Sequence, residues 1–255
     1  MEENIKDTKG VMLIVIGDIH GQFEKLTHYI SEYDLRDCVL IQAGDFGAGF
    51  KTLRKEKASM KYINSCLVAR NIVLYAIRGN HDNPKMFNEK TLDTSNIFLM
   101  KDYSTIILGD GRKILCVGGA ISVDRLPNPI ARDEYGKPWK GRTEGKNYWK
   151  DEPFVLNEEK LEAMRDVDIV ISHSAPNFVY PFGCKGSGTW INNDPTLYTE
   201  LMDERENIAK MYEILKKNNN PISHFLYGHF HNSNKEEKDG TVFKLLDIFE
   251  FYEVK

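Results

Sequence analysis

The sequence predicts an α/β fold in which two β-sheets are flanked by helices, and two observations carry this prediction. Short apolar runs alternate with amphipathic segments over the first 80 or so residues, which is typical of strands buried on both faces of a sheet. Several short strand-like segments then follow one another without helices, before helix and strand alternate again. The chain has 255 residues, which suits one such domain and is short for two.

The first part of the chain is predicted to contain three buried strands separated by two helices. The run VMLIVI is continuous and apolar, whereas Phe23, Leu26 and Ile30 recur at the spacing of one helix face. The predicted strands cover residues 11–16, 39–41 and 72–77, and the predicted helices cover residues 22–32 and 51–70.

The middle and the C-terminal part predict a second, more antiparallel sheet. The turn Gly109-Asp110-Gly111 joins two short strands as a hairpin, and Asp239-Gly240 marks a similar turn in a C-terminal hairpin or meander. The other elements expected here are strands at 97–99, 105–108, 113–117, 168–171 and 223–226, and helices at 157–165 and 195–217.

Composition and charge exclude several classes of protein. The net charge of −4 argues against strong nonspecific binding of nucleic acid. The N-terminus is charged and lacks the apolar core of a signal peptide, and the longest apolar run is too short to cross a membrane. The four cysteines, Cys38, Cys66, Cys116 and Cys184, are widely spaced and predict reduced thiols. We therefore expect a cytoplasmic protein that does not associate with a membrane.

Residues 122–153 form a long segment without a clear period, inside what we read as a single domain spanning residues 1–255. Its aromatic residues are Trp139, Tyr148 and Trp149, interspersed with arginines and lysines. Such a loop would cap an active site, stack a base and attract phosphates. The alternative is a surface loop whose aromatic side chains pack on the domain. Residues 183–190 form a second irregular segment, to which the sequence assigns no role.

Asp, Asn or His follows each of five predicted strands, and glycine precedes four of these groups. Ligand sites form at the carboxyl ends of strands in open α/β sheets. Asp, Asn and His bind divalent metals, and no cysteine lies within these motifs. Residues two apart in an extended segment point to the same side, so each such pair can share one ion. The motifs are Gly17-Asp18-Ile19-His20-Gly21, Gly44-Asp45, Gly79-Asn80-His81-Asp82, Ser172-His173 and Gly228-His229-Phe230-His231.

Each motif alone has an ordinary structural interpretation. Gly-Asp after a strand is often a turn, and Asn-His can cap a helix. The full series in this order is difficult to explain by structure alone. His28 and His224 lie outside the motifs, and we interpret them as surface or core residues.

Taken together, the motifs resemble those of the calcineurin-like metallophosphoesterase superfamily, over positions 17 to 231. The resemblance implies a four-layer αββα sandwich of two mixed β-sheets flanked by helices. It implies two divalent ions, whose identity (Mn, Fe or Zn) the ligand set does not fix. By motif, Asp18, His20 and His231 would hold one ion, Asn80, His173 and His229 the other, and Asp45 would bridge both.

The resemblance also implies the reaction. A hydroxide that bridges the two ions attacks the phosphorus in line, and His81 faces the substrate and helps to protonate the leaving oxygen. Asp45 and His81 are thus the expected catalytic residues. Protein phosphatases of the superfamily carry an Asp-Arg pair where this chain has Ala48 and Gly49.

Substitutes for that pair are therefore needed. We hypothesise that Arg125 contacts the phosphate and that Asp124 orients His81 or Arg125; the alternative is a surface ion pair of the two. Arg78 and Asn80 are further expected substrate contacts.

Three functions remain open from the sequence. The first is a phosphomonoesterase acting on a phosphoprotein or a small molecule. The second is a nucleotide phosphodiesterase or a dinucleoside polyphosphate hydrolase, which the aromatic residues of the 122–153 loop favour. The third is a noncatalytic scaffold, which we disfavour because every expected metal ligand and His81 are present.

Overall fold

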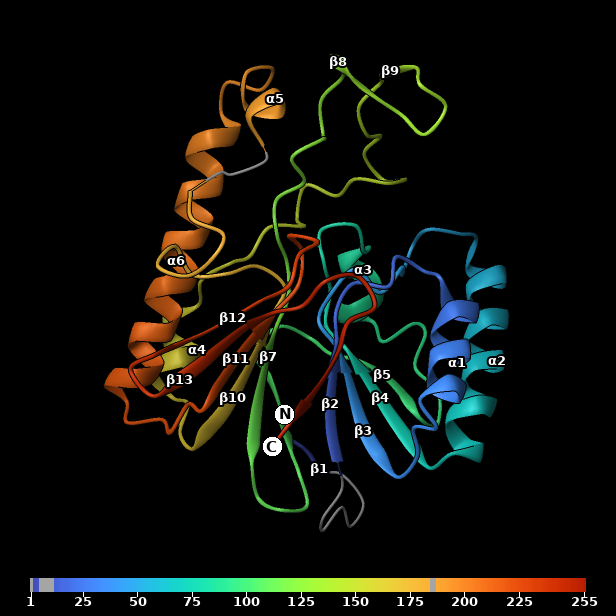
Figure 1. Ribbon diagram of the computed structural model, residues 1–255, viewed down its shortest axis with the longest axis vertical. Coiled ribbons are helices and arrows are strands. Elements are labelled where there is room, and N and C mark those ends of the chain that lie inside the picture. The colour runs from blue at the N-terminus through green and yellow to red at the C-terminus, as the bar shows by residue number, and fades with distance from the viewer. Residues whose placement is uncertain (1, 5–11, 184–186) are drawn as a thin grey trace.

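Two mixed β-sheets lie face to face, with helices on their outer sides (Figure 1). The computed structural model describes residues 2–4, 12–183 and 187–255. Within these residues the smaller sheet has the strand order β14-β2-β3-β4-β5 and the larger sheet the order β1-β6-β7-β10-β11-β13-β12.

The smaller sheet contains the first buried strands of the chain. Strands β2 to β5 are parallel, and β14 pairs antiparallel with β2. Consecutive residues of β2 are buried on opposite faces, since Ile14 packs toward the helices and Val15 toward the other sheet. The bounds are β2 (Met12–Ile16), α1 (Phe23–Glu32), β3 (Cys38–Gln42), α2 (Leu53–Ala69), β4 (Ile72–Ala76), α3 (Pro84–Asn88), β5 (Ile97–Leu99) and β14 (Phe251–Val254).

The larger sheet is built mainly from the second half of the chain. Strands β7, β10, β11 and β13 are parallel to one another, while β6 and β12 pair antiparallel with their neighbours β7 and β13. The bounds are β1 (Glu2–Asn4), β6 (Ser104–Ile107), β7 (Lys113–Val117), α4 (Glu158–Glu162), β10 (Val167–Ser172), α6 (Leu197–Lys217), β11 (His224–Tyr227), β12 (Asn234–Lys238) and β13 (Thr241–Leu245).

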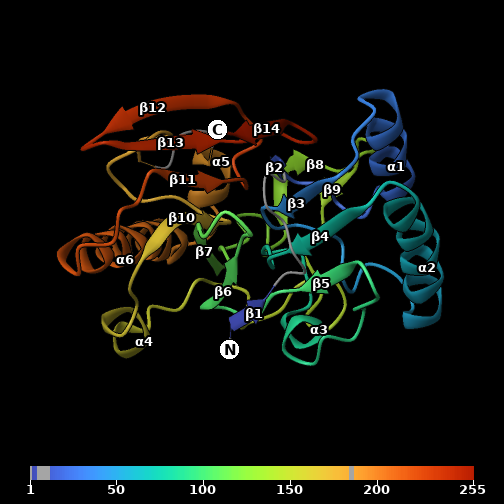
Figure 2. The same cartoon turned by 90° about the horizontal axis from the view of Figure 1, so that it is seen from below.

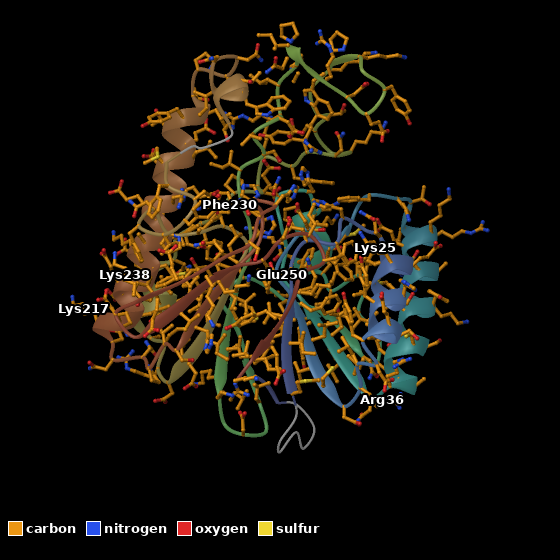
Figure 3. All side chains as sticks on the ribbon, in the orientation of Figure 1. Lys25, Arg36, Lys217, Phe230, Lys238 and Glu250 are labelled. Carbon is orange, nitrogen blue, oxygen red and sulfur yellow. The ribbon has the colours of Figure 1, made fainter. Side chains whose placement is uncertain are left out.

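Three apolar clusters hold the layers together. One joins the smaller sheet to α1 and α2, one fills the space between the sheets, and one joins the larger sheet to α6. Figure 2 shows the resulting order of helix, sheet, sheet and helix. Long charged side chains such as Arg36, Lys217 and Lys238 project from the outer edges (Figure 3). The four-layer fold implied by the sequence is confirmed.

Two strands differ from the sequence prediction in their sheet membership. β5 pairs with β4 in the smaller sheet, although it precedes a hairpin of the larger one. β14 leaves the C-terminal hairpin and returns to β2. The larger sheet is also more parallel than expected. Strand pairing over long sequence distances is set by tertiary packing, which a local apolar pattern does not contain.

The loop 122–153 stands above the sheets together with α5 (Gly188–Ile191) (Figure 1). It contains a short antiparallel pair, β8 (Asn128–Arg132) and β9 (Pro138–Trp139). The Asn128 side-chain amide donates a hydrogen bond of 3.0 Å to the carbonyl of Thr189, just inside α5. The loop 122–153 and α5 therefore contact each other.

Two further expectations concern the whole chain. Across the described residues, every helix is too short or too polar to cross a membrane. Cys38 is buried and Cys66 partly buried, and both are free thiols as expected, whereas Cys184 lies outside the described residues.

Candidate metal centre and active site

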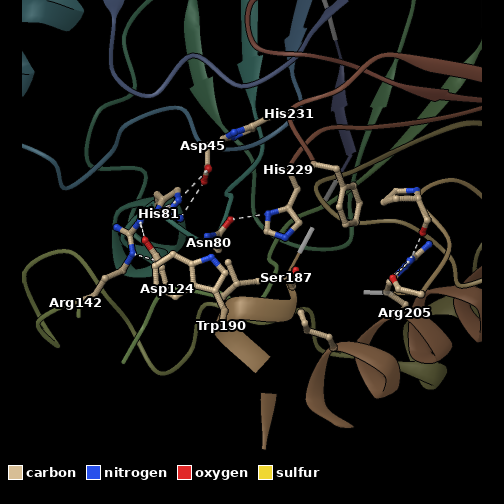
Figure 4. Close-up of a pocket in the computed structure, with 15 residues that line it drawn as sticks. Asp45, Asn80, His81, Asp124, Arg142, Ser187, Trp190, Arg205, His229 and His231 are labelled. Atoms are coloured by element: carbon tan, nitrogen blue, oxygen red, sulfur yellow. Dashed lines mark hydrogen bonds and ion pairs between the residues drawn. The ribbon is translucent and has the colours of Figure 1, made fainter. Parts of the chain in front are cut away.

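The motif residues from both sheets converge at the carboxyl ends of the strands, and Figure 4 shows Asp45, Asn80, His81, His229 and His231 around one cavity. Asp18 and His20 follow β2, Asp45 follows β3, and Asn80 and His81 follow β4. These lie on the smaller sheet, whereas the remaining residues follow strands of the larger sheet. His173 follows β10, and His229 and His231 follow β11.

The first group of side chains comprises Asp18, His20, Asp45 and His231, and one ligand atom from each lies within 4.8 Å of all the others. The Nε2 atoms of His20 and His231 are 3.0 Å apart, and Nε2 of His231 is 3.2 Å from Oδ2 of Asp18. That Oδ2 atom is buried and has no hydrogen-bond partner of good geometry among the described residues. An unsatisfied buried carboxylate oxygen beside two imidazoles fits a site for a cation.

The second group comprises Asn80, His173 and His229. Oδ1 of Asn80 is 3.1 Å from Nε2 of His173 and 3.0 Å from Nδ1 of His229. Asp45 connects the two groups. Its Oδ1 atom is 3.5 Å from Nε2 of His173, and its Oδ2 atom is 3.6 Å from Nδ1 of His20.

The protonation of His173 shows what the second group can bind. Nδ1 of His173 donates a 2.8 Å hydrogen bond to the carbonyl of Ala43, so Nε2 carries the lone pair of a neutral ring. Burial lowers the pKa of His173, which favours this neutral form. Nε2 of His173, Oδ1 of Asn80 and Oδ1 of Asp45 therefore face one another, and all three atoms are hydrogen-bond acceptors. Converging acceptors repel one another unless a cation lies among them, so these atoms fit the ligand set of a divalent metal.

Burial dominates the electrostatics of the centre. It raises the pKa of Asp45 well above its usual range, and the carboxylates of Asp18 and Asp82 add to this effect. It lowers the pKa of His20 to about 4 and that of His229 to about 3. A divalent cation would lower the pKa of Asp45, against the effect of burial, and would keep the imidazoles of His20 and His229 neutral. Its charge would be the largest in the centre.

Four of these residues have left-handed backbone conformations. The φ angles are 46° for His20, 56° for Asp45, 71° for His229 and 46° for His231. Such conformations cost about 1–3 kcal/mol each in a residue with a side chain, and they gather at functional sites. The strand ends thus turn sharply to aim these side chains at one another.

Two glycines allow ligands from different strands to approach closely. A Cβ atom at Gly44 would overlap the ring of His173, and one at Gly79 would overlap the carboxylate and backbone of Asp45. Gly44 also has a φ of +98°, which other residues rarely adopt. At both positions, glycine is therefore required by a ligand from a different motif.

Asp82 organises the loops of this centre, although the sequence assigned it no role. Its carboxylate accepts hydrogen bonds from the backbone N–H groups of Phe46, Gly47, Ala48 and Gly79, at 2.7–3.0 Å. Asp82 thereby ties the loop after β3 to the loop after β4. The position of Asp82 at the end of the Gly-Asn-His-Asp motif is the feature of the sequence that could have indicated this role.

His81 faces the cavity beside the metal groups and contacts an arginine from the long loop. Nε2 of His81 is 3.8 Å from Oδ2 of Asp45 and 3.4 Å from Nη2 of Arg142. The Asp124 carboxylate accepts hydrogen bonds from Nε and Nη2 of Arg142, the second of them at 2.7 Å (Figure 4). Burial and then the charge of Arg142 lower the pKa of His81 well below its usual range.

Arg125 does not lie beside the candidate metal centre, where a contact with the phosphate was predicted. Its guanidinium donates to Asp194 at 2.7 Å, to Glu200 and to Thr196, near the start of α6. Asp124 orients Arg142 instead, since both of its carboxylate oxygens accept hydrogen bonds from that guanidinium. The expected position of Arg125 is occupied by Arg142, because the loop reverses direction between the two residues.

Arg78 is buried under the loop and does not line the cavity. It donates to Asp102 at 2.9 Å and to the carbonyls of Glu152 and Pro153 at 2.5 and 3.0 Å. Its guanidinium therefore holds the end of the 122–153 loop. This corrects the expectation of a direct contact between Arg78 and the substrate.

A cavity of about 440 Å³ opens beside Asp45, Asn80 and His81. Its far wall is formed by residues of the long loop, by Pro181, Gly183, Ser187 and Trp190, and by residues of α6. Phe230, which is labelled in Figure 3, follows β11 and also lines the cavity. The wall includes Val123, Arg142, Pro181, Trp190, Leu201, Arg205 and Phe230.

None of the aromatic residues named from the sequence, Trp139, Tyr148 and Trp149, is among the residues that line the cavity. Trp139 donates its Nε1–H to the carbonyl of Asp124 at 2.7 Å and packs edge-on against Trp190. Trp149 is only 9% exposed. Trp190, in the segment that the sequence left without a role, is the tryptophan that lines the cavity.

Comparisons with known proteins agree with this geometry. The family model described as calcineurin-like phosphoesterase matches residues 12–233. No curated protein sequence matches the chain significantly.

Two solved structures share the fold at low sequence identity. TT1561 of Thermus thermophilus is 11% identical, with a TM-score of 0.54, and the match covers 93% of this chain and 89% of that one. The phosphopantetheinyl hydrolase of Mycobacterium tuberculosis is 14% identical, with a TM-score of 0.54 and the same coverage of both chains. The family match spans most of the sequence and includes all five motifs, so the chain belongs to the calcineurin-like phosphoesterase family of metal-dependent hydrolases.

Proposed function

We propose that this protein binds two divalent ions and hydrolyses a phosphomonoester of a small molecule. The observation that supports the two-ion proposal is the position of Asp45. One of its carboxylate oxygens faces His20 of the first group, and the other faces His173 of the second. Asp18, His20 and His231 would hold one ion, Asn80, His173 and His229 the other, and Asp45 would contact both.

Bound divalent ions would supply positive charge and a water of lowered pKa. The protein itself supplies orientation. Ala43 fixes the tautomer of His173, and the backbone N–H of His229 holds Oδ1 of Asp18 at 3.1 Å. A phosphate bound at this centre would lie beside His81, which lines the same cavity as Asp45 and Asn80.

Arg142 and His81 are the proposed substrate contacts from the protein. Arg142 lines the cavity next to His81, and Asp124 holds its guanidinium in place. Its positive charge would bind a phosphate oxygen and stabilise the charge that develops in the transition state. A bound phosphate would also favour the protonated form of His81, which opposes the lowering of its pKa, so that His81 can protonate the leaving oxygen.

The cavity favours a small molecule over a phosphoprotein. Residues of the long loop and of α6, together with Pro181 and Trp190, line it, and its volume lies within the range typical of small-molecule sites. A second candidate is a nucleotide phosphodiester or polyphosphate, which the half-buried ring of Trp190 on the cavity wall supports. A base would stack on that ring.

Turnover with Mn²⁺ tests these proposals. We expect hydrolysis of p-nitrophenyl phosphate to exceed that of bis-p-nitrophenyl phosphate, with Asp45→Asn as the inactive control. A screen of nucleotides, sugar phosphates and phosphopeptides then separates the substrate classes. If Trp190→Ala raises KM for nucleotides but not for p-nitrophenyl phosphate, the second candidate is preferred. Lack of all activity in a protein that has bound Mn²⁺ would contradict the proposed function.

A further inference from the structure

The side chains behind Asn80 form a buried chain of hydrogen bonds. Nδ2 of Asn80 donates to Oγ of Ser122 at 3.0 Å. Oγ of Ser122 donates in turn to Oε2 of Glu152 at 3.0 Å, and the backbone N–H of Ser122 donates to Oε1 at 2.7 Å. Asn80, Ser122 and Glu152 are each at most 2% exposed. Ser122 and Glu152 come from opposite ends of the 122–153 loop.

The direction of these hydrogen bonds fixes the orientation of the Asn80 amide. When Glu152 is ionised, its carboxylate only accepts hydrogen bonds, so Ser122 uses its single proton on Glu152. The serine oxygen can then only accept from Asn80, which must present its NH₂ group to it. The carbonyl oxygen of Asn80 is left facing His173 and His229, at 3.1 and 3.0 Å.

Glu152 is itself held by the motif that carries Asn80. Arg78, two residues before Asn80, donates to the backbone carbonyls of Glu152 and Pro153. Burial raises the pKa of Glu152 to about 8, whereas the two hydrogen bonds from Ser122 and then the charge of Arg142 act in the opposite direction. Positive charge at the nearby metal centre would further favour the ionised, acceptor form.

We propose that Glu152 and Ser122 are positioning residues that orient Asn80 as a metal ligand. This proposal rests on the proposed metal function of Asn80. Without the Glu152 carboxylate, the serine hydroxyl can donate to Asn80, and the amide can turn its NH₂ group toward the histidines. An NH₂ group cannot bind a cation, so the ion held by Asn80, His173 and His229 would bind more weakly.

Calorimetric titration of the full chain with Mn²⁺ tests this proposal. We expect Glu152→Gln and Ser122→Ala to weaken one of two Mn²⁺ binding events by about 10- to 100-fold, as is usual for partners behind a metal ligand. The other event, assigned to Asp18, His20 and His231, should keep its affinity. Melting temperatures measured without metal show whether each variant is folded.

The matched control is Glu56→Gln. Glu56 is an equally buried carboxylate that accepts hydrogen bonds from two backbone N–H groups, those of Gly49 and Lys51, neither of which is a candidate metal ligand. The substitution should leave both Mn²⁺ affinities unchanged. Unchanged affinities in both Glu152→Gln and Ser122→Ala would overturn the positioning role, while wild-type protein that binds no Mn²⁺ would instead overturn the proposed function. Weakening of both events equally would show general damage and also count against the proposal.

Discussion

Asp45 and His173 belong to different sheets, yet Oδ1 of Asp45 lies 3.5 Å from Nε2 of His173. Asp45 follows β3 of the smaller sheet, and His173 follows β10 of the larger one. The centre therefore exists only where the two sheets are packed against each other. Substitutions at the sheet ends should consequently change both stability and metal binding.

Gly44→Ala tests this dependence. The new Cβ would overlap the His173 ring, and the φ of +98° adds backbone strain. We expect a loss of unfolding free energy of more than about 2 kcal/mol, together with weaker Mn²⁺ binding. Urea unfolding and calorimetry measure the two effects.

The control is Gly111→Ala, at a turn with a φ of +94° and open space around its Cβ position. It should cost about 1–2 kcal/mol and leave Mn²⁺ binding intact. Equal effects of the two substitutions would show that the contact with His173 does not matter.

Arg142 and Arg125 provide a second comparison, because both are held by carboxylates but only Arg142 lines the cavity. We expect Arg142→Ala to lower kcat/KM by about 100-fold, as is typical when one donor to a developing charge is removed. Arg142→Lys should recover part of this loss, since it keeps the charge but not the paired geometry. Steady-state kinetics on the best substrate measures both.

Arg125→Ala should leave kcat/KM close to wild type. It should instead lower the stability by about 1–3 kcal/mol, because Asp194 would lose its charged partner. A large kinetic defect in Arg125→Ala with normal kinetics in Arg142→Ala would reverse our assignment of the two arginines.

The raised pKa of Glu204, which is not a candidate metal ligand, predicts that the stability of the protein depends on pH. Burial raises its pKa to about 7, from 4.5 in the unfolded chain. The folded state therefore holds this proton after the unfolded state has lost it, so wild-type stability falls as the pH rises from 4.5 to about 7. Glu204→Gln removes this contribution.

The free energy of unfolding of Glu204→Gln, relative to that of the wild type, should therefore rise by up to about 3 kcal/mol between pH 4 and pH 8. Urea unfolding of both proteins at the two pH values measures the difference. A difference that does not change with pH would show that the Glu204 carboxyl titrates normally in the folded protein.

The sequence allowed the ligand candidates to be predicted because each one is local to a strand end. An apolar run followed by Gly-Asp or Gly-His is visible without a structure, and the carboxyl ends of parallel strands meet at one edge of a sheet. This pattern brings together ligands within one sheet, whereas the approach of Asp45 to His173, which follow strands of different sheets, was implied only by the family resemblance.

The loop contacts were not predictable in the same way. Arg125 and Arg142 lie in one aperiodic segment, and only the path of the chain decides which of them reaches His81. Glu152 follows Asp151 in a charged stretch that reads as surface, yet it is 1% exposed behind Asn80. The membership of β5 in the smaller sheet likewise depends on long-range pairing that a short apolar run does not specify.

The most direct test of the account is a crystal structure of the wild-type chain grown with Mn²⁺, with the ions located by anomalous scattering. We predict two ions, both in contact with Asp45, one also bound by Asp18, His20 and His231 and the other by Asn80, His173 and His229. A single ion, or ions bound by other residues while this centre is without metal, would contradict the central claim.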